Sequence, residues 1–193
     1  MAMAHGLQRQ KMFNMYEETL NIPFIISGPE RRRGTSDSLV SLIDLLPTLA
    51  NLAGVPDIDR WTFKGRDLSP ILSNPDAEVQ GYIHFTYEDL YFYVPAANHI
   101  RVIVEKRWKY AVYFDVFMDA PFEYEMYDLD VPRDQREVVN LGHPDTPVSP
   151  EVAAERERLH QKLIQVMETL GTTPNGIAWP AHWGDQRSKG GYS

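Results

Sequence analysis

The chain has 193 residues, of which 43% are hydrophobic and 24% are charged, a composition typical of a folded globular protein and not of a disordered one. Its net charge is −8 and its basic residues are scattered apart from Arg31-Arg32-Arg33, which argues against nucleic-acid binding. The absence of cysteine excludes disulfides and zinc–thiolate sites, although it does not indicate a compartment.

The amino-terminal residues lack a basic stretch followed by an apolar one, and no run of about 18 apolar residues occurs anywhere in the chain. We therefore predict neither a signal peptide nor a membrane partner for this chain, and its default predicted location is cytoplasmic. A signal belonging to an upstream part, if one existed, would not be visible here.

The stretch from Lys11 to Pro29 passes from charged and polar residues into an almost uninterrupted apolar run. Residues Ile22–Ile26 are β-branched or aromatic apart from one proline, do not alternate with polar residues, and stop at Gly28. This pattern predicts a parallel strand that is buried on both faces inside a sheet larger than itself.

A helix is predicted next, with Asp44 as its N-cap and its end at about Ala53, where Gly54 supplies a stop. We expect its apolar face to pack on the sheet that contains Ile22–Ile26. The residues of that face are Leu45, Leu49, Leu52 and Ala53.

Residues 55–81 are interrupted by proline and glycine, which indicates a connector. Beyond it the chain is rich in Tyr, Phe, Val and Ile at short spacings, which predicts a small antiparallel sheet with one solvated face. The four predicted strands are Tyr82–Tyr87, His99–Glu105, Trp108–Phe114 and Glu123–Leu129.

Ser149 and Pro150 are typical of a helix N-terminus, and Gly171 of a helix end, so a helix to about Leu170 is expected across this sheet. The tail that follows contains two tryptophans that are expected to pin it to the surface. The predicted domains are residues 1–75, an α/β piece; residues 76–171, the small sheet and helix; and residues 172–193, an irregular tail.

Five groups of residues resemble, in family order, signature elements of the sulfatase family within the alkaline phosphatase superfamily. They cover about residues 5 to 141, and their order makes chance a poor explanation. The groups are His5-Gly6-Leu7 with Lys11, Met15–Glu18 and Ile22–Pro29; Val40–Leu49 with Leu52–Val55; Gly65–Leu68 with Pro70 and Leu72; Arg107–Tyr110; and Glu125–Leu129 with Asn140-Leu141.

The resemblance implies an α/β fold, the C-terminal portion of the sulfatase/alkaline phosphatase-like fold. This portion would be part of a larger sheet with a helix, followed by a small four-stranded antiparallel sheet packed by a C-terminal helix. It also implies a sulfuric ester hydrolase that uses formylglycine as nucleophile and Ca²⁺ or another divalent metal to clamp the sulfate. The histidines of this chain are dispersed, so no metal ligands are identified in it.

Ser27-Gly28-Pro29-Glu30-Arg31 fits the S-x-P-x-R pattern of the residue that the family oxidises to formylglycine. Its position argues against that role, because it follows the predicted strand and no aspartate cluster precedes it. We therefore interpret the chain as the C-terminal part of a sulfatase, and expect a missing N-terminal catalytic part or a partner chain to complete it. The isolated chain is predicted to be inactive.

Lys11 is the predicted catalytic and substrate-binding residue, because the resemblance implies that the lysine of the K…YEE motif contacts the sulfate group and offsets its charge. The alternative is an ordinary surface lysine. His5, in the HGL element, is the second predicted catalytic residue, as a proton donor to the leaving alcohol. Glu17 and Glu18 are interpreted as structural residues that fix the loop presenting Lys11.

Three further residues are predicted to bind substrate because they lie on the loop-rich edge of the small sheet. They are Tyr87, Tyr91 and His99.

Three other functions stay open beside the sulfatase. A phosphate or phosphonate ester hydrolase would use the same scaffold, since the discriminating residues would lie upstream. A non-catalytic module for anions or carbohydrates would keep Lys11 and the small sheet, and a structural remnant would need a partner chain for its apolar sheet edge.

Overall fold

The computed structural model describes residues 14–28, 33–88, 97, 99–116 and 120–186. Two compact units divide the chain: one joins Met1–Ile22 to His84–Ser193, and the other is Pro23–Ile83. Residues 14–22 therefore belong to the same unit as the C-terminal half of the chain.

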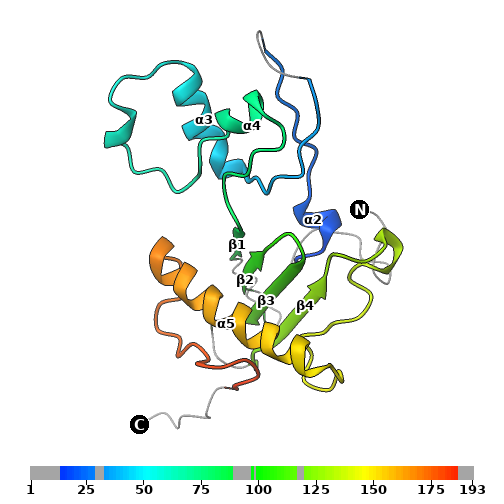
Figure 1. The fold of residues 1–193 in the computed structure, drawn as a ribbon. Helices are drawn as coiled ribbons and strands as arrows, with labels where there is room; N and C mark the ends of the chain where they lie inside the picture. The colour runs from blue at the N-terminus through cyan, green and yellow to red at the C-terminus, as the bar shows by residue number, and fades with distance from the viewer. Residues whose placement is uncertain (1–13, 29–32, 89–96, 98, 117–119, 187–193) are drawn as a thin grey trace. The chain divides into compact units, whose positions relative to one another are not determined.

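The first unit is built on a four-stranded sheet in the order β1-β2-β3-β4 (Figure 1). The strands are β1 Ile83–Tyr87, β2 His99–Val104, β3 Trp108–Phe114 and β4 Glu123–Asp128. Strand β3 pairs antiparallel with β2 and with β4, so that Tyr110 lies opposite Ile103 and Met126. The small antiparallel sheet predicted from the sequence is confirmed.

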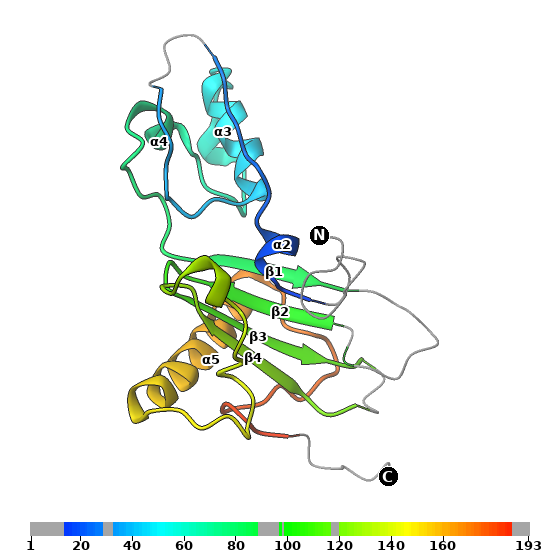
Figure 2. The same cartoon turned by 90° about the vertical axis from the view of Figure 1, so that its right-hand side faces the viewer.

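Helix α5, Pro150–Leu170, lies across one face of this sheet (Figure 2), as the sequence predicts. Ser149 caps it by accepting a hydrogen bond of 3.4 Å from the Val152 amide, and Gly171 ends it with a φ of 69°. The left-handed region suits glycine, which has no Cβ to clash there. The helix buries the stripe Leu159, Leu163, Val166 and Met167.

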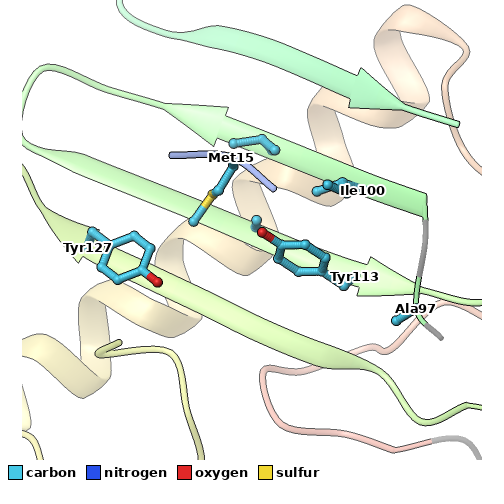
Figure 3. Packing of buried hydrophobic residues seen from close by; sticks show 7 residues of the cluster. Met15, Ala97, Ile100, Tyr113 and Tyr127 are labelled. Atoms are coloured by element: carbon cyan, nitrogen blue, oxygen red, sulfur yellow. The ribbon is translucent and has the colours of Figure 1, made fainter. Parts of the chain in front are cut away.

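The other face of the sheet is covered as well, so the prediction of a solvated face is wrong. All seven residues of β3 are buried, although successive side chains point to opposite faces. Figure 3 shows the Met15 side chain lying among Tyr113, Tyr127 and Ile100 on the face turned away from α5. Residues 14–20, including the short helix α2 at Glu17–Leu20, form the cover that local alternation did not reveal.

The tail after α5 is held by its two tryptophans, as predicted. The Trp179 ring packs edge-on against Phe114 and Phe122, with ring centroids 5.4 and 5.8 Å away. The Arg156 guanidinium lies 3.6 Å from the centroid of the Trp183 ring. Aromatic contacts therefore fix a segment that has no regular secondary structure.

The second unit contains short helical elements: η1 Leu42–Asp44, α3 Leu45–Leu52, η2 Ile58–Arg60 and α4 Ser69–Ser73. The buried Asp44 carboxylate accepts hydrogen bonds of 2.7 Å from the amides of Ser41 and Arg66 and from the Gln80 side chain. Asp44 is the N-cap residue of α3, as predicted, but its carboxylate makes no cap hydrogen bond to that helix and instead closes a capping box with Ser41 in the η1 turn.

The strand predicted at Ile22–Ile26 is also wrong in this structure. These residues have no regular secondary structure, and the Ile25 side chain is 89% exposed. A strand needs a neighbour for its backbone hydrogen bonds, and none of the strands described here pairs with this segment. Leu49 of α3 is 52% exposed for the same reason, because the sheet that its helix was expected to cover is not formed by the described residues.

Candidate functional site

The candidate site is the place where residues 14–20 meet strand β3, because this short segment begins three positions after Lys11. Lys109, in the middle of the sheet, is fully buried. Its Nζ atom donates to the Met15 carbonyl at 3.1 Å, to Glu137 Oε1 at 2.6 Å, and to Glu17 Oε1. An ammonium group has three N–H donors, so this environment satisfies all of them.

Glu137 holds the same segment from the loop after β4. While its Oε1 accepts from Lys109, its Oε2 accepts a 2.8 Å hydrogen bond from the Glu17 backbone amide. Its backbone has a φ of 59°. A residue other than glycine destabilises the fold by about 1 to 3 kcal/mol when its backbone is in the left-handed region, and the surrounding contacts must offset this cost.

A third carboxylate, that of Glu125 on β4, lies close to the Lys109–Glu137 ion pair. Burial raises the pKa of Glu125 to about 6, and the nearby Glu137 charge adds to the shift, although hydrogen bonds from Tyr113 and Tyr127 oppose it. The Tyr113 hydroxyl donates to Glu125 Oε2 at 2.9 Å. Burial, and then the Glu125 charge, also raise the pKa of Tyr127, so both phenols stay protonated donors.

The N-terminal segment is also closed on itself. Asn14 Oδ1 accepts from the Tyr16 amide at 3.2 Å and from the Thr19 hydroxyl at 2.5 Å. Side chains of this kind that bond to nearby backbone amides define a turn. Residues 14–19 therefore form a fixed turn, and Lys109 with Glu137 attaches that turn to the sheet.

The predicted site residues are placed as follows. Lys11, His5 and Tyr91 lie outside the described residues. Tyr87 is half-buried and packs against the Met15 cluster. His99 is buried on the opposite face, its ring 5.3 Å from that of Phe114. Tyr87 and His99 thus lie on different faces, and the pocket that they were predicted to share remains a prediction.

The structural interpretation of Glu17 is supported by its contact with the buried Lys109, whereas Glu18 is exposed. Sequence reasoning missed Lys109 as a partner, although a signal was present: a lone lysine stands inside the apolar strand Trp108–Phe114. A charge at such a position needs a buried counter-charge. Glu137, in the polar loop after β4, gave no such signal.

Among the described residues, no group of three or more His, Cys, Asp or Glu is arranged to hold a metal ion. The described residues therefore offer no ligand set for the divalent cation that the sulfatase resemblance implies, and no step is assigned to it. No helix in the described part of the chain is long and apolar enough to cross a membrane.

A shallow hollow of about 430 Å³ lies near the candidate site on the same unit. Its wall includes Tyr127 and Glu137, which also belong to the buried network, and the exposed Val138 and Val139. The hollow is thus bounded on one side by the residues that hold the N-terminal turn.

The sheet carries a long helix on one face and the anchored turn of residues 14–20 on the other. A helix over a small antiparallel sheet is what the sulfatase resemblance implies for the C-terminal part of that fold. Residues 4–169 match the family model described as N-sulphoglucosamine sulphohydrolase, C-terminal. The chain belongs to this family.

Relatives of known name agree with this assignment. Arylsulfatase K of Rattus norvegicus is 32% identical over 146 residues, which are 74% of this chain and 24% of that protein. Arylsulfatase K of Xenopus laevis is 33% identical over 147 residues, 74% of this chain and 26% of that protein. The chain therefore spans about a quarter of the length of these relatives.

A solved structure has the same fold. The crystal structure of a putative sulfatase from Bacteroides thetaiotaomicron superimposes with a TM-score of 0.64 at 27% identity, covering 88% of this chain and 34% of that one. The predicted fold class, the C-terminal portion of a sulfatase with a small sheet and a C-terminal helix, is confirmed.

Proposed function

We propose that this chain acts as the C-terminal part of a sulfuric ester hydrolase and contributes Lys11 and part of the substrate pocket to it. The match of residues 4–169 to the sulfatase C-terminal family carries this proposal. The names of the relatives, arylsulfatase K and endo-4-O-sulfatase, favour a sulfate ester as the substrate class.

In the proposed reaction, Lys11 binds a non-bridging or leaving oxygen of the sulfate group. Negative charge grows on these oxygens as the sulfur–oxygen bond breaks, so a fixed ammonium group stabilises the transition state more than the ground state. His5 is proposed to give a proton to the leaving alcohol, which makes that alcohol a better leaving group. Tyr87, Tyr91 and His99 remain proposed substrate contacts.

The nucleophile and the metal ligands would belong to a catalytic part that is separate from these 193 residues. A cation such as Ca²⁺ would clamp the sulfate there and needs several oxygen ligands at once. Ser27, the residue with the S-x-P-x-R pattern, lies exposed in a segment without regular secondary structure. Among the described residues, no group of three or more His, Cys, Asp or Glu that could hold a metal ion lies beside it.

A second candidate is a phosphate or phosphonate ester hydrolase of the same superfamily. Lys11 would bind a phosphoryl oxygen as well as a sulfuryl oxygen, because both present negative oxygens to an ammonium group. A comparison of an aryl sulfate with an aryl phosphonate in one enzyme preparation separates the two candidates.

The test completes residues 1–193 with the catalytic part of a related sulfatase and measures turnover of an aryl sulfate. Lys11→Ala is expected to lower kcat by a factor of about 10 to 100, since one charge-assisted hydrogen bond contributes about 1.5 to 3 kcal/mol. Lys106→Ala, in the turn between β2 and β3, is the matched control. A decrease of less than about threefold for Lys11→Ala would contradict the assignment of Lys11.

A further inference from the structure

We propose that Lys109 and Glu137 are positioning residues, whose ion pair attaches the turn at residues 14–20 to the sheet and so restricts where Lys11 can place its ammonium group. The catalytic part of this inference rests on the proposed sulfatase function. The attachment itself is a property of this chain and can be measured without any turnover.

The first observation is where the three hydrogen-bond acceptors of Lys109 Nζ come from. Two of them, the Met15 carbonyl and Glu17 Oε1, belong to the N-terminal turn, and the third belongs to Glu137. If the turn left the sheet, the buried ammonium would lose two of its three partners. Docking of the turn and satisfaction of this charge are therefore one event.

The second observation is that the Glu137 carboxylate accepts hydrogen bonds both from the sheet and from the N-terminal turn. One carboxylate oxygen meets Lys109 Nζ at 2.6 Å, and the other meets the Glu17 amide at 2.8 Å. The side chain of Glu137 is only 2% exposed. Its left-handed backbone, with a φ of 59°, is the kind of strained conformation that is kept where the surroundings require it.

The third observation is the covalent distance from the anchor to Lys11. Lys11 precedes Asn14 by three positions, so its Cα cannot be more than about 11 Å from the Cα of Asn14. The turn cannot easily change shape, because Asn14 bonds to both Tyr16 and Thr19. A shift of the anchor therefore moves Asn14, the point from which the chain runs back to Lys11.

The attachment is tested first on the chain alone by amide hydrogen exchange. In Lys109→Met, the amides of residues 15–20 are expected to exchange at least about tenfold faster, and by a larger factor than the amides of β3 and β4. Lys162→Met is the matched control. Lys162 lies on α5 and also pairs with a glutamate, Glu105, which follows strand β2. Unchanged exchange in residues 15–20, or equal acceleration across the whole sheet, would overturn the inference.

A second variant keeps the exchange test decisive if Lys109→Met does not fold. Glu17→Gln removes one charge from the turn itself and leaves the sheet intact, because Glu17 lies in α2 and not in a strand. The same local acceleration in residues 15–20 is expected, and its absence in this folded variant counts against the inference in the same way.

The consequence for Lys11 is tested in the enzyme completed with a sulfatase catalytic part. Lys109→Met is expected to lower kcat for an aryl sulfate about 10- to 100-fold, because a displaced group loses its alignment. In a Lys11→Ala background the same change should cost less than about twofold further, since the two act through one group. Lys109→Arg, which keeps the charge, should restore part of the rate.

Equal losses of kcat in both backgrounds would show that Lys109 does not act through Lys11 and would overturn its positioning role. If Lys11→Ala alone left kcat unchanged, the proposed function of Lys11 would fail, whereas the exchange experiment would still decide whether the turn is anchored. The two failures are thus distinguishable.

Discussion

At the scale of single residues, the sheet is unusual because charge lies in its interior. Lys109 is fully buried next to Glu137 and Glu17, and Glu125 lies on the same face one strand away. Breaking a buried ion pair by removing one partner typically costs about 3 to 5 kcal/mol, because a charge is left without compensation. We therefore expect this cluster to determine how firmly the N-terminal turn is held.

Glu125 gives a pH-dependent prediction. Its pKa of about 6 lies above its ordinary value of 4.5, so the folded protein binds this proton more tightly than the unfolded chain does. The stability that the proton contributes, about 2 kcal/mol, is present below pH 4.5 and is lost as the pH rises through 6. In Glu125→Gln, which cannot ionise, the free energy of unfolding should lack this decrease.

Urea unfolding between pH 4.5 and 7.5 measures the difference between Glu125→Gln and the parent chain. The exposed Glu123→Gln on the same strand is the control, and it should follow the parent curve. A constant difference between Glu125→Gln and the parent over this range would show that Glu125 does not take up a proton on folding.

At the scale of elements, local signals were sufficient for β2, β3 and α5, whose ends coincide with caps and turn residues. No local signal indicated that Gly142, which follows the loop containing Glu137, lies very close to the backbone of strand β4. A Cβ added there would lie 2.7 Å from the backbone of Glu125 and Met126. Strand β4 and this loop can pack together only because residue 142 has no side chain.

Gly142→Ala is therefore expected to be destabilising, by about 1 to 3 kcal/mol, because the clash is with backbone that cannot rotate away. Gly81→Ala is the matched control, since a Cβ at residue 81 meets nothing within 4 Å. Thermal unfolding of both variants measures the difference, and equal melting temperatures would contradict the close packing of the loop on β4.

At the scale of the whole molecule, the two units differ in how they cover apolar residues. The sheet of the first unit is buried on both faces, whereas the second unit exposes Ile25, Leu46 and Leu49 by 89%, 63% and 52%. Apolar groups that are exposed together favour association. The Leu46→Gln/Leu49→Gln double variant is expected to lower self-association of the chain.

Sedimentation velocity over a range of concentrations measures this effect. The control is Val138→Gln/Val139→Gln, which changes two valines that are also exposed, by 70% and 58%, but lie in the first unit. A parent chain that sediments as a monomer at all concentrations would contradict the prediction that the exposed residues of α3 associate.

Catalytic silence of the chain alone is a separate prediction. Residues 1–193 with added Ca²⁺ should hydrolyse neither an aryl sulfate nor an aryl phosphonate, since Lys11 can bind an anion but cannot attack one. Steady-state assays with both substrates measure this. Turnover that disappears in Ser27→Ala would identify Ser27 as the nucleophile and would contradict our interpretation of the S-x-P-x-R pattern.

The four strands and the C-terminal helix could be predicted from the sequence, because their caps, turn residues and apolar spacing lie close together in the chain. The family could be predicted from the order of its motifs, whereas the partners of the tail tryptophans, such as Phe114, lie far away in the sequence. The strand at Ile22–Ile26 could not be decided in this way, since a strand exists only with a neighbour. The second face of the sheet is covered by residues 14–20, and Lys109 pairs with Glu17, 92 positions away, and with Glu137, 28 positions away. Only the tertiary structure brings such residues together, because burial of a charge is satisfied in space and leaves no periodic pattern in the chain.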